Sequence, residues 1–330
     1  MIKINKDRIE INGYSITNTA NGVEINGNFE YGGDIPPPPP PMAGTVSGYT
    51  SGGFLFPSSV NTIDKFPFAT DANATDVGDL TQVRYNVAGQ SSIENGYTSG
   101  GFAPPSVNTI DKFPFATDAN ATDVGDLTQA RYASAGQSSN ENGYTSGGFA
   151  PPSVNTIDKF PFATDANATD VGDLTQARYY STGQSSSESG YTSGGNTPTA
   201  NIIDKFPFAT DANATDVSDL TVARQRAAGQ SSSENGYTSG GVDPSFTTVN
   251  TIDKFPFATD ANATDVGDLT QGRYGAAGQS SSENGYTSGG RSPPPDVINT
   301  IDKFPFASDA SATDVGDLTQ ARRLVAGQQD

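Results

Sequence analysis

Gly96-Tyr-Thr-Ser-Gly-Gly101 decides the fold, because this chain of 330 residues contains the hexapeptide six times. The copies are 46 to 49 residues apart and begin at Gly48, Gly96, Gly143, Gly190, Gly236 and Gly285. Each copy leads to a nearly invariant block, Asn108–Arg131 in the second unit. A period in this range is typical of propellers and solenoids, whose units cannot bury their apolar faces alone. The sequence therefore predicts one array of six units.

Four short strand candidates, separated by turn-forming residues, recur within each unit. Around the third copy they are Ala135–Ser139, Gly143–Ser146, Val154–Phe160 and Thr169–Leu174. No stretch has a 3.6-residue period long enough for a core helix. Four strands in a unit of about 47 residues match a propeller blade, and radial closure leaves only short, protected edges. We therefore predict an all-β fold, a six-bladed β-propeller with four-stranded blades.

Three regions divide the chain. Residues 1–34 alternate apolar residues with Asn-Gly turns, which predicts a small β-rich N-terminal segment. Six prolines, Pro36–Pro41, follow, so residues 35–42 should form a stiff polyproline linker. The propeller takes 43–330. Because residues 1–34 are too few to bury a core, we expect them to attach to a partner or to oligomerise by pairing strands with identical chains; the alternative is that they pack against their own propeller.

The spacing at the two ends of the array predicts how the ring closes. Inside the array, Ala88-Gly precedes Gly96 by eight residues, whereas Ala43 precedes Gly48 by only five. The C-terminus, from Arg322 to Gln329, repeats the missing Arg-x-x-x-Ala-Gly-Gln. We therefore expect the C-terminal strand to supply the inner strand of the first blade.

Composition excludes several kinds of site. The chain has no Cys, no His and no Trp, which rules out zinc fingers, iron–sulfur ligation, disulfides, thiol nucleophiles and histidine-based triads. The net charge of −19 disfavours nucleic-acid and membrane-surface partners. The N-terminus lacks the apolar run of a signal peptide, and no stretch reaches membrane-spanning length, so no membrane insertion is expected. We expect neither a cofactor nor a catalytic site.

The order of features in a unit resembles the kelch repeat over about 43–330. A strand ends in Gly-Gly, a variable loop leads to an aromatic strand, and Asp-Leu-Thr-x-x-Arg closes the unit, for example at Arg131. The Trp usual in the fourth kelch strand is missing. The sequence Ile110-Asp-Lys-Phe-Pro-Phe115, followed by Asp-Val-Gly-Asp-Leu-Thr, also looks like repeats in structural, tail-fibre-like proteins of marine tailed phages.

This resemblance implies a non-enzymatic virion structural protein that displays a propeller for adhesion to a receptor or surface. It would reside in the extracellular particle after assembly in the host cytoplasm. Residues 1–34 would attach it to a virion protein or to identical chains. Two alternatives remain: a glycan-active propeller enzyme and a cellular kelch-like scaffold that binds peptides. The enzyme requires unlike residues around the axis, whereas near-identical blades should supply rings of like residues.

Several repeated residues have a structural interpretation. Asp71–Asp79 spaces oxygen side chains as a calcium loop would, but it lacks an EF-hand's central Gly and final Glu, and it suits a hairpin turn. The Asn-Ala-Thr sequons in these segments are also interpreted as turns. The recurring Asp79 and Arg84 suggest a structural ion pair, or a hydrogen-bonding Arg, between blades. Phe66 and Phe68 should be core aromatics between blades, and Pro67 should end its strand.

The copies disagree mainly in the loop after each Gly-Gly, in both length and chemistry. On a rigid scaffold such loops should cluster on one face, where they contact a receptor or glycan; the alternative is neutral variation of tolerant loops. The candidate ligand-binding residues are Phe54, Phe56, Phe102, Phe149, Asn196, Phe246 and Arg291. No catalytic or metal-binding residue is predicted.

Overall fold

The computed structural model describes residues 2–5, 8–11, 14–19, 22–26, 44–293 and 297–330. The chain divides into two units, Met1–Pro38 and Pro39–Asp330, and the expected linker at 35–42 lies outside the described residues. The first unit is a four-stranded antiparallel meander, made by β1 (Ile2–Asn5), β2 (Arg8–Ile11), β3 (Tyr14–Thr19) and β4 (Gly22–Asn26). The described residues contain no helix that could cross a membrane.

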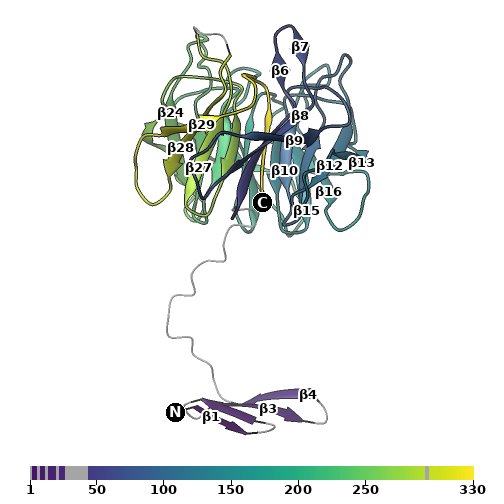
Figure 1. Ribbon diagram of the computed structural model, residues 1–330, viewed down its shortest axis with the longest axis vertical. Coiled ribbons are helices and arrows are strands. Elements are labelled where there is room, and N and C mark those ends of the chain that lie inside the picture. Colours follow the sequence, from purple (N-terminus) through teal and green to yellow (C-terminus); the bar gives the residue numbers. More distant parts are fainter. Residues whose placement is uncertain (1, 6–7, 12–13, 20–21, 27–43, 294–296) are drawn as a thin grey trace. The chain divides into compact units, whose positions relative to one another are not determined.

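The second unit is a six-bladed β-propeller, as the repeat predicts (Figure 1). Each blade is an antiparallel sheet of four strands. From the axis outward, the first blade is β30 (Ala326–Gln329), β5 (Ser47–Ser51), β8 (Thr62–Pro67) and β9 (Thr75–Asp79). The second is β10 (Ala88–Ser91), β11 (Asn95–Ser99), β12 (Thr109–Pro114) and β13 (Thr122–Asp126). The third is β14 (Ala135–Ser138), β15 (Asn142–Ser146), β16 (Thr156–Pro161) and β17 (Thr169–Asp173).

The other three blades follow the same order. The fourth is β18 (Thr182–Ser185), β19 (Ser189–Ser193), β20 (Ile202–Pro207) and β21 (Thr215–Asp219). The fifth is β22 (Ala228–Ser231), β23 (Asn235–Ser239), β24 (Thr251–Pro256) and β25 (Thr264–Asp268). The sixth is β26 (Ala277–Ser280), β27 (Asn284–Ser288), β28 (Thr300–Pro305) and β29 (Thr313–Asp317). A short hairpin, β6 (Phe54–Leu55) and β7 (Ser58–Ser59), extends the first blade.

Local sequence explains where the strands end. In the second blade Gly100 and Gly101 have φ of +59° and +113°, so both follow β11 in the left-handed region that glycine tolerates best. A Cβ atom at Gly100 would lie 2.6 Å from the carbonyl oxygen of Arg131. Each of the six Gly-Gly pairs adopts this conformation. Pro67 is the last residue of β8, as expected, since proline lacks the donor that a continuing ladder needs.

The apolar core lies between blades. Phe66 and Phe68 of the first blade pack on Tyr286 of the sixth, with ring centroids 5.6 and 4.8 Å apart, which confirms their expected role. Ile301 and Leu318 belong to the same cluster, and equivalent clusters fill the other five interfaces. Each buried aromatic contributes on the order of 2 kcal/mol, so no blade is stable without its neighbours.

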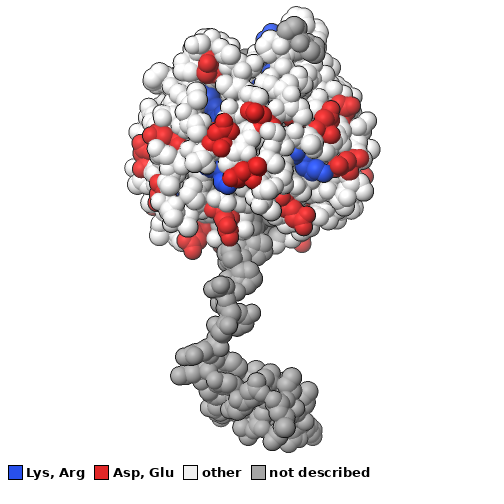
Figure 2. Space-filling model, turned by 90° about the vertical axis from the view of Figure 1, so that its left-hand side faces the viewer, with Lys and Arg blue, Asp and Glu red and all other residues white. Residues whose placement is uncertain are grey.

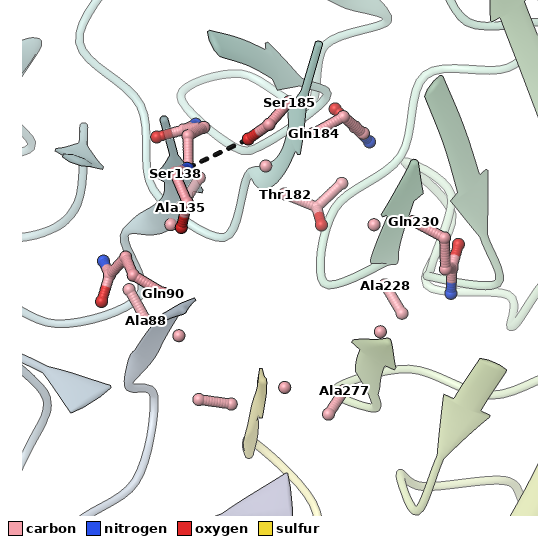
Figure 3. A pocket seen from close by; sticks show the side chains of 18 of the residues that line it. Ala88, Gln90, Ala135, Ser138, Thr182, Gln184, Ser185, Ala228, Gln230 and Ala277 are labelled. Atoms are coloured by element: carbon pink, nitrogen blue, oxygen red, sulfur yellow. Dashed lines mark hydrogen bonds between the residues drawn. The ribbon is translucent and has the colours of Figure 1, made fainter. Parts of the chain in front are cut away.

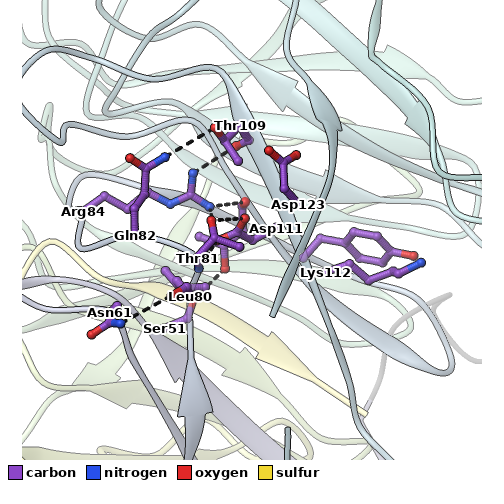
Figure 4. A network of polar contacts seen from close by, with 12 residues as sticks. Ser51, Asn61, Leu80, Thr81, Gln82, Arg84, Thr109, Asp111, Lys112 and Asp123 are labelled. Carbon is purple, nitrogen blue, oxygen red and sulfur yellow. Dashed lines mark hydrogen bonds and ion pairs between the residues drawn. The ribbon is translucent and has the colours of Figure 1, made fainter. Parts of the chain in front are cut away.

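A buried ion pair also joins each blade to the next. Arg84 Nη2 lies 3.0 Å from Asp111 Oδ2 of the second blade, and both side chains are fully buried (Figure 4). The same carboxylate accepts hydrogen bonds from the Thr81 backbone N–H at 2.9 Å and from its hydroxyl at 2.7 Å. The structural role expected of Arg84 is therefore confirmed, but the expected partner, Asp79, is wrong. The Arg84 backbone is still hydrogen-bonded to Gly53 and Val60 of the first blade, and its side chain reaches across to the second blade, where Asp111 is the carboxylate within range.

The inner strands meet closely around the axis. A Cβ atom at Gly136 of β14 would overlap the carbonyl oxygen of Gly89 of β10, and the same holds around the ring. These strands surround an axial cavity of about 150 Å³ (Figure 3). The Ser138 backbone N–H donates to the Ser185 hydroxyl at 3.0 Å, which links neighbouring strands. Close approach is possible only because glycine occupies the crowded position.

The C-terminal strand completes the first blade. β30 pairs with β5, with Ala326 opposite Ser51 and Gln328 opposite Tyr49. The Gln328 amide donates to the Ser51 hydroxyl at 2.9 Å and to the Tyr97 carbonyl of the second blade at 3.0 Å. The two ends of the array are thus held in one sheet.

Candidate functional site

The variable loops lie on one face of the propeller, which we call the loop face. The first residue after each Gly-Gly forms an antiparallel bridge, or backbone hydrogen bonds, with the residue that follows a repeated arginine. Examples are Phe102 with Tyr85 and Arg291 with Tyr274. In Figure 1 the hairpin β6–β7 stands at the top of the propeller, and the C-terminus lies at its lower end. Two sequence-distant segments of every blade therefore meet on this face.

Seven aromatic rings follow one another around part of the loop face, and we call them the aromatic arc. Their successive centroids are 5.2, 5.5, 5.3, 5.4, 5.3 and 4.8 Å apart, in the order Phe54, Tyr85, Phe102, Tyr132, Phe149, Tyr179 and Tyr180. The rings are half-buried and tilted, as aromatic pairs prefer. Burial raises the pKa of Tyr85 and of Tyr132, so these phenols stay protonated near neutral pH and can donate hydrogen bonds.

Arginines and one tyrosine complete the ring. The Arg226 guanidinium lies 4.0 Å from the centroid of Tyr180 and 5.5 Å from that of Tyr274. Arg323 lies 5.6 Å from the Phe54 centroid, and its Nη1 is 3.4 Å from the Tyr274 hydroxyl. Arg291 donates to the same hydroxyl at 3.0 Å. We call Arg226, Arg291 and Arg323 the basic arc. Together with Tyr274 and the aromatic arc, they form a closed collar around the axis.

Inside the collar, six residues form the mouth of the axial cavity. These residues, the mouth hexad, are Asn86, Ala133, Tyr180, Arg226, Gly275 and Leu324, and all have φ between +55° and +66°. Each backbone N–H donates to the carbonyl of the preceding member, for example Ala133 to Asn86 at 2.8 Å and Arg226 to Tyr180 at 2.8 Å. They line a second cavity of about 60 Å³. Left-handed backbone at five non-glycine residues is a strained conformation of the kind that clusters at functional sites.

The mouth hexad limits one sequence-based expectation. Near-identical blades should place rings of like residues around the axis, and the inner strands do so, for example with Gly89 and its equivalents. At the mouth, however, the six equivalent positions carry six different residues. The variation at these positions is visible in the sequence. Three variable residues follow each repeated arginine, as Tyr179-Tyr-Ser181 follows Arg178, and a small residue and a glycine come next. These three residues lie outside the loops that follow Gly-Gly, so the predicted site residues do not include them.

The predicted site residues divide into two groups. Phe54, Phe102 and Phe149 are half-buried in the collar, because they pack on the tyrosines that follow the repeated arginines. Asn196 donates to the Tyr179 hydroxyl at 2.9 Å, and Arg291 belongs to the basic arc. Phe56 and Phe246 project into solvent with 79% and 76% of their surface exposed.

The basic arc is exceptional in an acidic protein. Of 18 Lys and Arg residues, twelve are repeated and three lie in 1–34, which leaves Arg226, Arg291 and Arg323. The twelve repeated cations each pair with an aspartate. Figure 2 shows acidic side chains spread over this side of the propeller, with a few basic side chains among them. The three propeller cations outside the repeat pattern all lie on the loop face.

The Asp-rich turns between third and fourth strands serve the scaffold. The Asn120 side-chain oxygen accepts from the Asp79 backbone N–H of the preceding blade at 3.0 Å, and Asp76 accepts from the Gly78 N–H at 3.2 Å. These bonds support the interpretation of the segment as a turn. Over the described part of the chain, no three Asp or Glu residues come together as a possible metal site.

Comparison with known proteins adds no relative to these observations. No family model matches the chain, and no curated protein matches it either. The collar and the mouth hexad therefore have to be interpreted from their own chemistry.

Proposed function

We propose that the protein is a non-enzymatic virion structural protein that uses the loop face of its propeller for adhesion. One observation carries the binding role: blades that copy each other in their strands, core and ion pairs differ in the collar and the mouth hexad. A rigid scaffold with one variable face suits recognition. The resemblance of the repeat sequence to those of tail-fibre-like phage proteins supports the placement in a phage particle.

The N-terminal unit supports the attachment role. Its meander leaves β1 and β4 as edge strands, each with one row of backbone groups that no strand of the sheet pairs. Such edges can accept a further strand from another chain. We propose that residues 1–34 pair with identical chains or with a virion protein, and that the propeller is presented beyond the linker.

A glycan-active enzyme is the second candidate. An active site on the axis requires unlike residues around it, and the mouth hexad supplies them. The hexad offers an amide, a phenol and a guanidinium. Glycoside hydrolysis usually uses a pair of carboxylates, and the side chains at the mouth suit hydrogen bonding and stacking. We therefore favour binding over turnover. A cellular peptide-binding scaffold is the third candidate.

Exchange of the loops should test the binding role. On a glycan array, the wild-type protein should bind a subset of glycans, and replacement of Phe54–Ser59 by the Phe102–Ser106 sequence should change that subset. Ile93→Ser is the matched control, because Ile93 is exposed in the turn between β10 and β11, and the fourth blade carries serine there. Identical patterns for the loop exchange and the wild-type protein would contradict recognition through this face.

Deletion of residues 1–42 should test the attachment role. The propeller lies within Pro39–Asp330, so the truncated protein should remain folded, with unchanged melting of its β structure. It should, however, no longer be recovered with purified particles when it is expressed during infection. Recovery at the wild-type level, or unfolding of the propeller, would show that this attachment model is wrong.

A further inference from the structure

We propose that the mouth of the loop face binds the terminal unit of a carboxylated saccharide, with the carboxylate held by Arg226 and Arg323 and the sugar ring against the aromatic arc. This assignment rests on the binding role proposed above and names the ligand class. It requires an anion-binding group, a surface for the ring and a reason why the ligand ends at the mouth.

Arg226 is the anion-binding group. Among the described residues its side chain makes no hydrogen bond or ion pair, although the chain contains 37 Asp and Glu residues. Its Nε is buried and has no hydrogen-bond partner. The Tyr180 ring stacks near its guanidinium, so the donors along the guanidinium edge remain to be satisfied. A planar carboxylate matches that edge in a bidentate manner.

Arg323 reinforces the positive charge. Its guanidinium packs on Phe54 and contacts the Tyr274 hydroxyl, and its Nε is also buried without a partner. Arg226 and Arg323 both contact Tyr274, so two cations are held near one phenol. An anion between them relieves their mutual repulsion and supplies the missing acceptor.

The aromatic arc provides the surface for the sugar ring. Its rings are half-exposed and lie directly beside the guanidinium, because Tyr180 belongs to both the arc and the mouth hexad. The protonated Tyr85 and Tyr132 phenols can bond sugar hydroxyls. Apolar ring faces bordered by polar hydrogen-bonding groups suit a saccharide, which has C–H faces and hydroxyl edges.

The backbone of the mouth explains the limit on ligand size. The N–H and C=O groups of the mouth hexad bond each other in a closed circle, so they offer no free strand edge to an extended peptide. Below them, the inner strands enclose an axial cavity of only about 150 Å³, which leaves little room for a long chain. The net charge of −19 disfavours polyanions such as nucleic acid. A single terminal ring with one carboxylate satisfies all three conditions.

The test measures binding to the full-length protein by calorimetry. The probes are glucuronate, galacturonate and N-acetylneuraminate, with glucose, acetate, inorganic phosphate and a hexaglutamate peptide as comparisons. At least one carboxylated saccharide should bind about tenfold or more tightly than every comparison probe. Arg226→Gly should weaken that binding by about tenfold or more. Gly275 occupies the equivalent position with φ of +66°, so this variant keeps the backbone of the mouth.

Two further variants complete the design. Arg226→Lys keeps the charge but loses the planar fork, so it should also weaken binding. Lys112→Gln removes the same charge from the outer flank and should leave binding within about twofold. No saccharide binding, equal affinity for acetate or phosphate, tighter binding of hexaglutamate, or an unaffected Arg226→Gly would each overturn the assignment. A loop-dependent array signal that survives Arg226→Gly overturns this assignment alone, whereas loss of all loop dependence overturns the binding role.

Discussion

Replacement of Asp111 by alanine should lower the free energy of unfolding by about 3–5 kcal/mol, because it leaves the Arg84 charge buried without its partner. Burial lowers the pKa of Arg84, and the charge of Asp111 opposes that effect, followed by that of Asp123, so the Asp111 carboxylate stabilises the charged guanidinium. The variant also removes the acceptor of the Thr81 N–H and hydroxyl. Urea unfolding followed by circular dichroism measures the loss.

The neighbouring residue supplies the control. Lys112 follows Asp111 in β12 and pairs with Asp165 at 2.5 Å, but this pair is at the surface. Lys112→Gln should cost only about 0–1 kcal/mol, since water screens an exposed pair. Equal losses for the two variants would contradict the idea that burial decides the contribution. Asp111→Leu with Arg84→Met should not restore full stability, because the Thr81 N–H would still lack its acceptor.

Much of the propeller could be predicted from the repeat. The strand expected at Gly143–Ser146 is β15, Asn142–Ser146, because the Gly-Gly pair ends it unambiguously. The strand expected from Val154 begins instead at Thr156. The reason is that the Val154 N–H turns back to the Gly148 carbonyl at 2.9 Å inside the loop. A local pattern of β-branched residues does not reveal such a loop bond.

The candidate site was harder to predict, because its residues come together only through the strand register. Tyr85 and Phe102 are 17 residues apart and meet in an isolated bridge between two connecting segments. The partner of Arg84 lies 27 residues away in the next blade for the same reason. The Phe residues after Gly-Gly stand out in the sequence, whereas the tyrosines beyond the next arginine come to pack between them only in the folded ring.

Deletion of residues 326–330 should lower the free energy of unfolding of the propeller by about 5 kcal/mol or more. Because natural domains are only marginally stable, most molecules of this variant should unfold or aggregate. Without β30, the buried edge of β5 loses its pairing along Gly48–Ser51. The Tyr97 carbonyl and the Ser51 hydroxyl lose the Gln328 amide. Each buried polar group left unsatisfied costs about 1–3 kcal/mol, so several of them exceed the contribution of any single side chain. Thermal melting and size-exclusion chromatography measure the outcome.

A rescue variant separates loss of the strand from loss of the terminus. In it, the eight residues directly before Gly48 in the truncated protein are replaced by a copy of Ala277–Asn284. The inner strand of the first blade and the turn that follows it then come from the N-terminal side of the array. The eight-residue spacing to Gly48 then equals that of the sixth blade. The fold should return, but with a lower melting temperature than the wild-type protein, since no single sheet would then hold both ends of the array. Full stability of the truncated chain without the copy would mean that β30 does not close the ring, and that contacts between blades alone keep the sixth blade against the first.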